Sequence, residues 1–167
     1  MDKRYLVIII IIFICAINLY AITNFSDVVG SASVDIGNYT ISLPEGFSLY
    51  EEGNDQILIS NPNSHMRIRI YSTLAPDDTY SNQTQEINSS SKYTLLSNGT
   101  VNINGNNIQC FFFQIVEGHD NCSVFYYTKN NHNFKIFMSG FNYDLQKNES
   151  VKLAESIADT TRINYKK

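Results

Sequence analysis

An apolar run near the N-terminus is the feature that most constrains this chain. Residues Tyr5 to Ile22 read YLVIIIIIFICAINLYAI, and the only strongly polar member is Asn18. As a helix, these 18 residues would be about 27 Å long, close to the thickness of the hydrocarbon core of a bilayer. The sequence therefore predicts a membrane-spanning segment, and the rest of the chain must fold without it.

The basic residues around this run predict its orientation. Lys3 and Arg4 precede the run, and the next basic residue is Arg67. Because basic residues stay on the cytoplasmic side, the N-terminus is expected in the cytoplasm and the rest of the chain outside. We predict a transmembrane anchor over residues 1–23, a linker over 24–35 and an extracytoplasmic domain over 36–167. The protein is then a single-pass protein of the cell membrane.

Other interpretations of the N-terminus remain open. A cleaved signal peptide is the main alternative, although its apolar region usually spans about 7 to 15 residues. Ala21 is a suitable cleavage residue, but Leu19, two positions earlier, is not small. A lipoprotein signal would need a small residue in place of Ile14, which precedes Cys15. A pilin-like start would need a glycine before the run and a glutamate within it, and the sequence has neither.

The part of the chain after the linker has the alternating pattern of β-strands. In Met66 to Tyr71, for example, apolar residues alternate with Arg67 and Arg69, as expected for a sheet with one face open to water. The last three predicted strands have apolar residues at successive positions, so both faces should be covered. The predicted strands are Asn38–Leu43, Gln56–Ser60, Met66–Tyr71, Thr94–Ser97, Val101–Ile103, Ile108–Val116, Ser123–Lys129 and Phe134–Phe141.

Two segments have helical patterns. Residues Asn148 to Arg162 place Leu153, Ala154 and Ile157 on one stripe, which predicts an amphipathic helix lying across the sheet. Within the polar stretch Pro76 to Ser91, a helix capped by Asp77 or Asp78 is one interpretation, and a long loop is the other. The predicted fold class is α+β: an antiparallel sheet with a C-terminal helix packed on it, preceded by one transmembrane helix.

Three stretches of sequence resemble a known fold family. The opening YTISLPEGF, the hairpin INGNNIQCFFFQI and the terminal helix VKLAESIADTTRI are similar to PsbP/Mog1-like small α/β sandwich domains, over about residues 38 to 163. Similar membrane-anchored versions of uncharacterised function occur in bacteria and methanogenic archaea. The resemblance implies an antiparallel sheet with helices against it and a binding or accessory role. It implies no catalytic residues.

Few residues in the sequence suggest chemistry. No nucleophile, P-loop, zinc-protease or dinucleotide-binding motif is present. His65, His119 and His132 are each expected in a separate turn, and the acidic residues of the predicted loop 51–55 lack the spacing of an EF-hand. We therefore predict no catalytic, cofactor-binding or metal-binding residue and no cofactor. The net charge of −4 also argues against a nucleic-acid partner.

Two cysteines and several asparagines are candidates for modification. If residues 117–121 form a turn, Cys122 lies opposite Val116, so Cys110 is roughly 20 Å away along the strand, too far for a simple disulfide. A disulfide through a different strand pairing, an intermolecular bond and free buried thiols all remain open. Among the Asn-x-Ser/Thr sequences, Asn82, Asn88 and Asn98 are the expected glycosylation sites.

Taken together, these patterns favour a non-enzymatic protein. We predict an accessory or binding module that is anchored in the membrane and faces an envelope protein or polymer outside the cell. A cell-envelope hydrolase and a structural glycosylated surface protein are the alternatives. A concave pocket that gathers polar groups would be the feature that separates these classes.

Overall fold

The structure is a computed structural model and describes residues 32–103 and 106–164. The predicted membrane segment and most of the predicted linker lie outside these residues. The elements, in chain order, are β1 (Ser33–Ile36), β2 (Tyr39–Ser42), β3 (Ser48–Glu52), β4 (Gln56–Ser60), β5 (Arg67–Tyr71), α2 (Tyr80–Ser89), β6 (Tyr93–Ile103), β7 (Asn106–Ile115), β8 (Asn121–Lys129), β9 (His132–Phe141), α3 (Tyr143–Thr160) and β10 (Arg162–Ile163).

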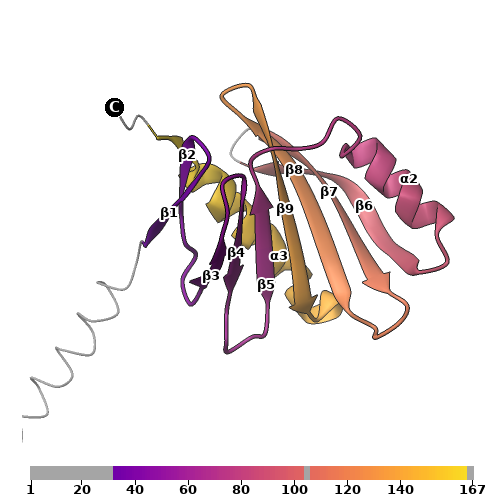
Figure 1. The fold of residues 1–167 in the computed structure, drawn as a ribbon. Coiled ribbons are helices and arrows are strands. Elements are labelled where there is room, and N and C mark those ends of the chain that lie inside the picture. Colours follow the sequence, from indigo (N-terminus) through magenta and orange to yellow (C-terminus); the bar gives the residue numbers. More distant parts are fainter. Residues whose placement is uncertain (1–31, 104–105, 165–167) are drawn as a thin grey trace, which may run out of the picture. The chain divides into compact units, whose positions relative to one another are not determined.

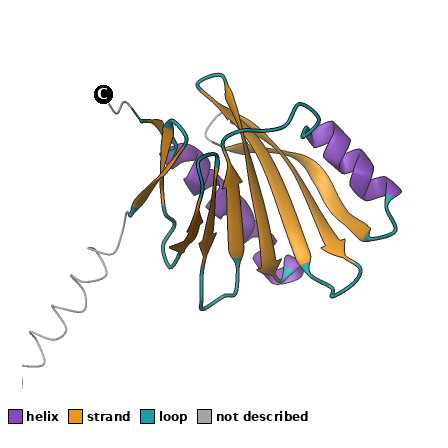
Figure 2. Cartoon of the chain, viewed as in Figure 1, coloured by secondary structure: helices purple, strands orange, loops and turns teal. Residues whose placement is uncertain are grey.

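The strands form two antiparallel sheets. The larger sheet has seven strands in the order β3-β4-β5-β9-β8-β7-β6, and the smaller has the order β1-β2-β10. Neighbours in the larger sheet are joined mostly by short connections. The exception is the pair β5 and β9, which brings together two strands far apart in the sequence. Figure 2 shows the sheet with one helix beside each of its faces. The predicted α+β class, with an antiparallel sheet and a C-terminal helix packed on it, is confirmed.

Successive side chains of the central strands pack alternately into two separate cores, one on each face of the sheet. On β7, Phe112 belongs to the core under α3, whereas Phe111 and Phe113 belong to a smaller core under α2. The same division continues on β8, where Phe125 faces α3 and Val124 faces α2. The prediction that both faces of these strands are covered is therefore correct, and the two helices are what cover them.

The C-terminal helix covers the larger core. Its N-cap is Asn142, whose side-chain oxygen accepts a hydrogen bond from the backbone N–H of Leu145 at 3.2 Å. The predicted start at Asn148 was therefore five residues too late. Ala154 and Ile157, on the predicted apolar stripe, are fully buried.

The short helix α2 exists, but its cap is not the predicted one. Thr79 is the N-cap, and its hydroxyl accepts from the backbone N–H of Asn82 at 3.3 Å. Asp78 instead points toward the sheet, where it pairs with groups on β8 and β9. Thr84 and Ile87 are buried on the sheet side of α2.

Three strands were not predicted, because they are either short or fully exposed. β1 begins at Ser33, inside the range 24–35 that the sequence suggested as linker. Glu51 and Glu52, which were predicted in a loop, belong to the edge strand β3. All five residues of this strand are exposed, so its sequence shows no alternation. β10 is only two residues long.

Within the described residues, no helix is long and apolar enough to cross a bilayer.

The cysteines occupy opposite faces of the sheet. Cys122 pairs with Phe113 in the register between β7 and β8, rather than with Val116, because the turn begins one residue earlier than predicted and β8 starts at Asn121. Cys110 lies in the core under α3 and Cys122 in the core under α2, and both are free thiols. An internal disulfide between them is therefore excluded in this fold.

Burial should make both thiols unreactive in the folded protein. Desolvation raises the pKa of Cys110, and it raises the pKa of Cys122 to about 12, with the charge of Asp120 adding to the second shift. We expect iodoacetamide to alkylate both residues only after unfolding, as measured by peptide mass spectrometry. Rapid alkylation of either thiol in the native protein would contradict this arrangement.

Two phenylalanines provide a test of the core assignment. Phe125 is fully buried, whereas Phe137, which the apolar pattern of its strand also predicts to be buried, is only partly covered at the margin of the core under α2. Phe125→Ala should lower the free energy of unfolding by about 3–5 kcal/mol, because it leaves a cavity. Phe137→Ala should cost clearly less. Urea denaturation of the two variants would check the order, and equal losses would show that the burial is assigned wrongly.

Candidate functional site

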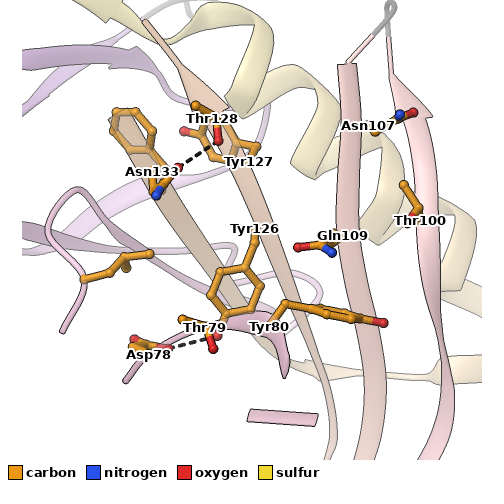
Figure 3. A pocket seen from close by; sticks show the side chains of 12 residues that line it. Asp78, Thr79, Tyr80, Thr100, Asn107, Gln109, Tyr126, Tyr127, Thr128 and Asn133 are labelled. Carbon is orange, nitrogen blue, oxygen red and sulfur yellow. Dashed lines mark hydrogen bonds between the residues drawn. The ribbon is translucent and has the colours of Figure 1, made fainter. Parts of the chain in front are cut away.

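A concave site lies on the α2 face of the large sheet, between the start of α2 and the ends of four strands (Figure 3). Its cavity has a volume of about 550 Å³, within the usual range of ligand sites. We call it the polar basin. It is lined by Leu74, Asp78, Thr79, Tyr80, Thr100, Asn107, Gln109, Tyr126, Tyr127, Thr128, Asn133 and Phe134.

The basin exists because the apolar pattern stops part-way along the strands. On β7, the residues that face α2 run from Asn107 and Gln109 to Phe111 and Phe113. The two phenylalanines lie under the helix, whereas the two amides are exposed. Since α2 has only 10 residues, it covers one half of this face and leaves the polar half open.

One wall of the basin is built on a partly buried ion pair. Asp78 pairs with Lys135, and the side chains of the two residues are 17% and 15% exposed. The Tyr126 hydroxyl donates to the other oxygen of the same carboxylate at 2.9 Å, and the Lys135 ammonium lies 4.7 Å from the centre of the Tyr71 ring. The single negative charge that lines the basin is therefore already neutralised.

Tyr126 is held in its neutral form by this environment. Burial raises its pKa well above the ordinary value, and the hydrogen bond to Asp78 and the negative charge of that residue raise it further. The phenol therefore keeps its proton and donates it in the hydrogen bond to Asp78. It contributes the apolar surface of its ring to the basin rather than an acid or base.

The remaining polar groups are amides and hydroxyls. Thr128 donates to Asn133 at 2.8 Å, and Asn102 donates to Asn107 at 3.0 Å (Figure 3 shows the first bond). Within the described part of the chain, the side chains of Gln109 and Thr100 make no hydrogen bond to protein groups. These side chains are exposed, so they are ready to bind a ligand or water.

Aromatic rings supply the apolar surface. The Tyr80 ring meets the Tyr126 ring edge-on, with centroids 6.4 Å apart and an interplanar angle of 86°. The rings of Tyr127 and Phe134, in contrast, belong to the core under α3 on the other face of the sheet, where they are buried and stack with centroids 4.9 Å apart. The hydroxyls of Tyr127 and Thr161 share a hydrogen bond of 3.0 Å, which joins β8 to the end of α3.

The basin is chemically neutral. Among its lining residues there is one carboxylate, which is paired, and no lysine, arginine or histidine. Such a site can orient a polar uncharged molecule through hydrogen bonds and ring contacts. It offers no proton-transfer pair of the kind that hydrolysis needs.

The histidines singled out in the sequence do not meet. His65 and His119 lie in separate connections between strands, as predicted, and both have positive φ. His132 is instead the first residue of β9; its ring stacks on Tyr39 at 4.9 Å and donates to the carbonyl of Ser72. In residues 32–103 and 106–164, no group of three or more His, Cys, Asp or Glu side chains is placed to hold a metal ion.

The three expected glycosylation sites are all exposed. Asn82 and Asn88 lie on α2, and Asn98 lies on the edge strand β6. The side-chain nitrogen of Asn82 donates to the carbonyl of Asp77 at 3.0 Å. Their modification stays a prediction.

The residues of the basin were missed because each one is ordinary by itself. The signal that would have found them is the same-face pattern of β7, where two amides precede two phenylalanines on the side that α2 covers. Read with the polar position Asn133 on β9 and Thr128 on β8, it marks an uncovered polar area at one end of a sheet. The contribution of Asp78, a residue far away in sequence, had no local signal.

Comparison with known proteins gives structural matches only. No family model and no curated protein matches the chain. Similar solved structures include the cyanobacterial PsbP of Synechocystis sp. PCC 6803, with 12% identity, 80% of this chain and 92% of that chain covered, and a TM-score of 0.45. The Ran-binding protein Mog1p of Saccharomyces cerevisiae is 11% identical, with 80% of this chain and 96% of that chain covered and a TM-score of 0.47. LpqN of Mycobacterium tuberculosis, which is involved in cell envelope biogenesis, is 13% identical, with 80% of this chain and 90% of that chain covered and a TM-score of 0.45.

The two proteins that give the predicted fold family its name are thus both among these structures. At this level of similarity, however, the matches support no argument about ligand or partner, so the function must be argued from the basin itself.

Proposed function

We propose that this protein is a membrane-tethered binding module that holds a neutral glycan of the cell envelope in the polar basin. The observation that carries the proposal is the lining of the basin, in which exposed amides and hydroxyls surround aromatic rings and no charge is left unpaired. The membrane anchor and the extracytoplasmic location are the predictions made from the apolar run and the basic residues before it.

The charges of the basin favour an uncharged ligand. A charged group that leaves water is costly unless an opposite charge meets it. Asp78 is already occupied by Lys135 and Tyr126, so the lining offers no free charge to an ionic ligand. A nucleic acid, a phosphorylated molecule or an amino acid would therefore be bound poorly.

The hydrogen-bonding groups suit a ligand that carries many hydroxyls. A carboxamide both donates and accepts, so one Gln or Asn side chain can bind two neighbouring hydroxyls of a sugar. Gln109 stands exposed beside Thr100, with Asn107 and Asn133 at the margins of the same basin. Tyrosine rings such as those of Tyr80 and Tyr126 offer flat apolar surface to the C–H groups of a sugar ring.

The openness of the site favours part of a polymer over an enclosed small molecule. Most of the polar residues that line the basin are exposed, whereas a lipid or cofactor pocket is mostly apolar and covers most of its ligand. A basin of this kind is suited to a few sugar units at the end or along the side of a longer chain.

Ligand binding can be tested with an array of neutral and charged oligosaccharides and then by calorimetric titration. The full-length protein should be kept in a detergent without a sugar headgroup, since a glycosidic detergent would compete. We expect neutral oligosaccharides to bind. Gln109→Ala should weaken binding about three- to ten-fold, the effect of one lost neutral hydrogen bond, and Tyr80→Ala should also weaken it.

Gln85→Ala is the matched control, because Gln85 is an exposed glutamine on α2 outside the basin. It should leave the affinity unchanged. A preference for charged ligands, or equal affinities for Gln109→Ala and Gln85→Ala, would rule out the proposed site.

The location has its own test. Protease added to intact cells or spheroplasts should digest the domain, because it is expected outside the membrane. Sequencing of the mature N-terminus should find the apolar run still attached. Protection of the domain until lysis would refute the extracytoplasmic location, and a mature N-terminus at Ile22 would show a cleaved signal peptide.

A further inference from the structure

Three polar side chains from distant parts of the sequence meet at the edge of the large sheet, on the face opposite the polar basin. They are Ser97 of β6 and Tyr143 and Lys147 of α3. The Tyr143 hydroxyl donates to Ser97 Oγ at 3.0 Å, and Lys147 Nζ donates to the same Oγ and to the Tyr143 oxygen, each at 3.1 Å. Each side chain thus contacts both of the others.

The local structure of both elements brings these groups together. Tyr143 and Lys147 are four residues apart, so they lie on the same side of the first turns of α3. Ser97 follows a β-bulge between Leu95 and Ser97, where the register of β6 against β7 shifts by one residue. Bulges redirect side chains and are common beside active sites. Here the bulge turns Ser97 toward α3.

The cluster rests on an apolar floor and is reached from solvent. Lys147 Nζ lies 5.1 Å from the centre of the Phe112 ring and 5.2 Å from that of Tyr143, and Phe112 is only 2% exposed. Ser97, Tyr143 and Lys147 are themselves half-buried. An apolar floor strengthens the interactions between the charged and polar groups above it.

The surroundings of Tyr143 lower its pKa, so its hydroxyl loses a proton more readily than that of an ordinary tyrosine. The hydrogen bond with Ser97 lowers its pKa most; burial acts in the opposite direction, while the hydrogen bond and charge of Lys147 lower the pKa and Asp144 raises it. The net shift is downward from the ordinary value of 10. The other titratable group beside this cluster is Cys110 of β7, which is buried and protonated.

We propose that Ser97 is a nucleophile for acyl transfer, with Tyr143 as its general base and Lys147 as the cation that stabilises the tyrosinate. Once Tyr143 has lost its hydroxyl proton to solvent, Ser97 Oγ bonds to the carbonyl carbon of an ester, and the serine proton passes to the Tyr143 oxygen. The bond to the alcohol then breaks, and Tyr143 gives the proton to the departing alkoxide. Water then attacks the acyl carbon and gives a proton to Tyr143. The bond to Ser97 breaks, Tyr143 returns the proton to Ser97 Oγ, and the carboxylic acid leaves.

The position of Ser97 on an edge strand adds a further requirement of this chemistry. β6 has a partner strand on one side only, so the N–H groups on its other side have no strand to bond to. Backbone N–H groups of this kind stabilise the oxyanion of an acyl-transfer intermediate. The site is separate from the polar basin, and its activity does not depend on glycan binding.

The test uses the full-length protein and a fluorophosphonate probe. Ser97 Oγ should attack phosphorus and expel fluoride while its proton passes to Tyr143, and peptide mass spectrometry should find the label on Ser97. Ser97→Ala should abolish labelling. Tyr143→Phe, which keeps the ring that packs at 5.6 Å from Phe112, should slow labelling by about 100-fold or more if the general base is lost.

A dependence on pH separates catalysis from a purely structural role. The labelling rate should rise with pH, with a midpoint below 10, the ordinary pKa of tyrosine. Lys147→Met should move that midpoint upward, and Lys147→Arg should restore most of the shift. Ser48→Ala is the matched control, because Ser48 is an exposed serine on the opposite edge strand, β3, and it should leave labelling unchanged.

Three results would overturn the proposal: no label at all, a label on another residue, or labelling of Ser97 that Tyr143→Phe leaves unchanged. Circular dichroism would verify that each variant is folded. Glycan binding measured on Ser97→Ala should equal that of the unaltered protein, so failure of this proposal can be distinguished from failure of the proposed binding function.

Discussion

The whole fold depends on covering a sheet whose central strands are apolar on both faces. Phe112 and Phe125 need α3, whereas Phe111 and Phe113 need α2, and neither core would be protected from water without its helix. The two helices are unequal, with 18 residues in α3 and 10 in α2. The face under α3 is therefore closed along most of its length, and the face under α2 is closed only in part. The polar basin is the part left open, so the site follows from the same constraint that forms the core.

The sequence predicts the central strands well because their pattern is local. Strands β7, β8 and β9 combine apolar runs with turn residues between them, and those signals need no knowledge of distant parts of the chain. The edge strand β3 gives no such signal, since a strand that buries no side chain needs no alternation. The start of α3 was placed too late because its first turn holds no buried residue, and only the Asn142 cap marks it. Burial creates the pattern that sequence analysis reads, so an exposed element such as β3 is missed. β1 buries Val34 and Ile36, but it is only four residues long and lies in a polar stretch, so it was missed for a different reason.

The sites could not be predicted in the same way because they join residues far apart in sequence. Asp78 reaches Lys135 across 57 residues, and Ser97 meets Tyr143 across 46. The nearest sequence signals are partial ones: two amides before two phenylalanines on β7, and the four-residue spacing of Tyr143 and Lys147 on a helix. Each pattern is common, and each becomes informative only once the pairing of β6, β7 and β8 is known. The three histidines show the opposite case, because they are chemically conspicuous in the sequence and stay apart in the fold.

The bulge in β6 connects the architecture to both sites. In a regular strand, Leu95 and Ser97 would face the same side, because side chains alternate with a period of two. Here Leu95 packs in the core under α2, whereas Leu96 and Ser97 both face α3. Beyond the bulge the alternation resumes, so Thr100 returns to the α2 side and lines the basin opposite Gln109. One additional residue thus lets a single edge strand supply a hydroxyl to each face of the sheet. Because the two hydroxyls lie on opposite faces, a change at one of them can leave the other in place, and this is why binding and acyl transfer can be tested independently in one chain.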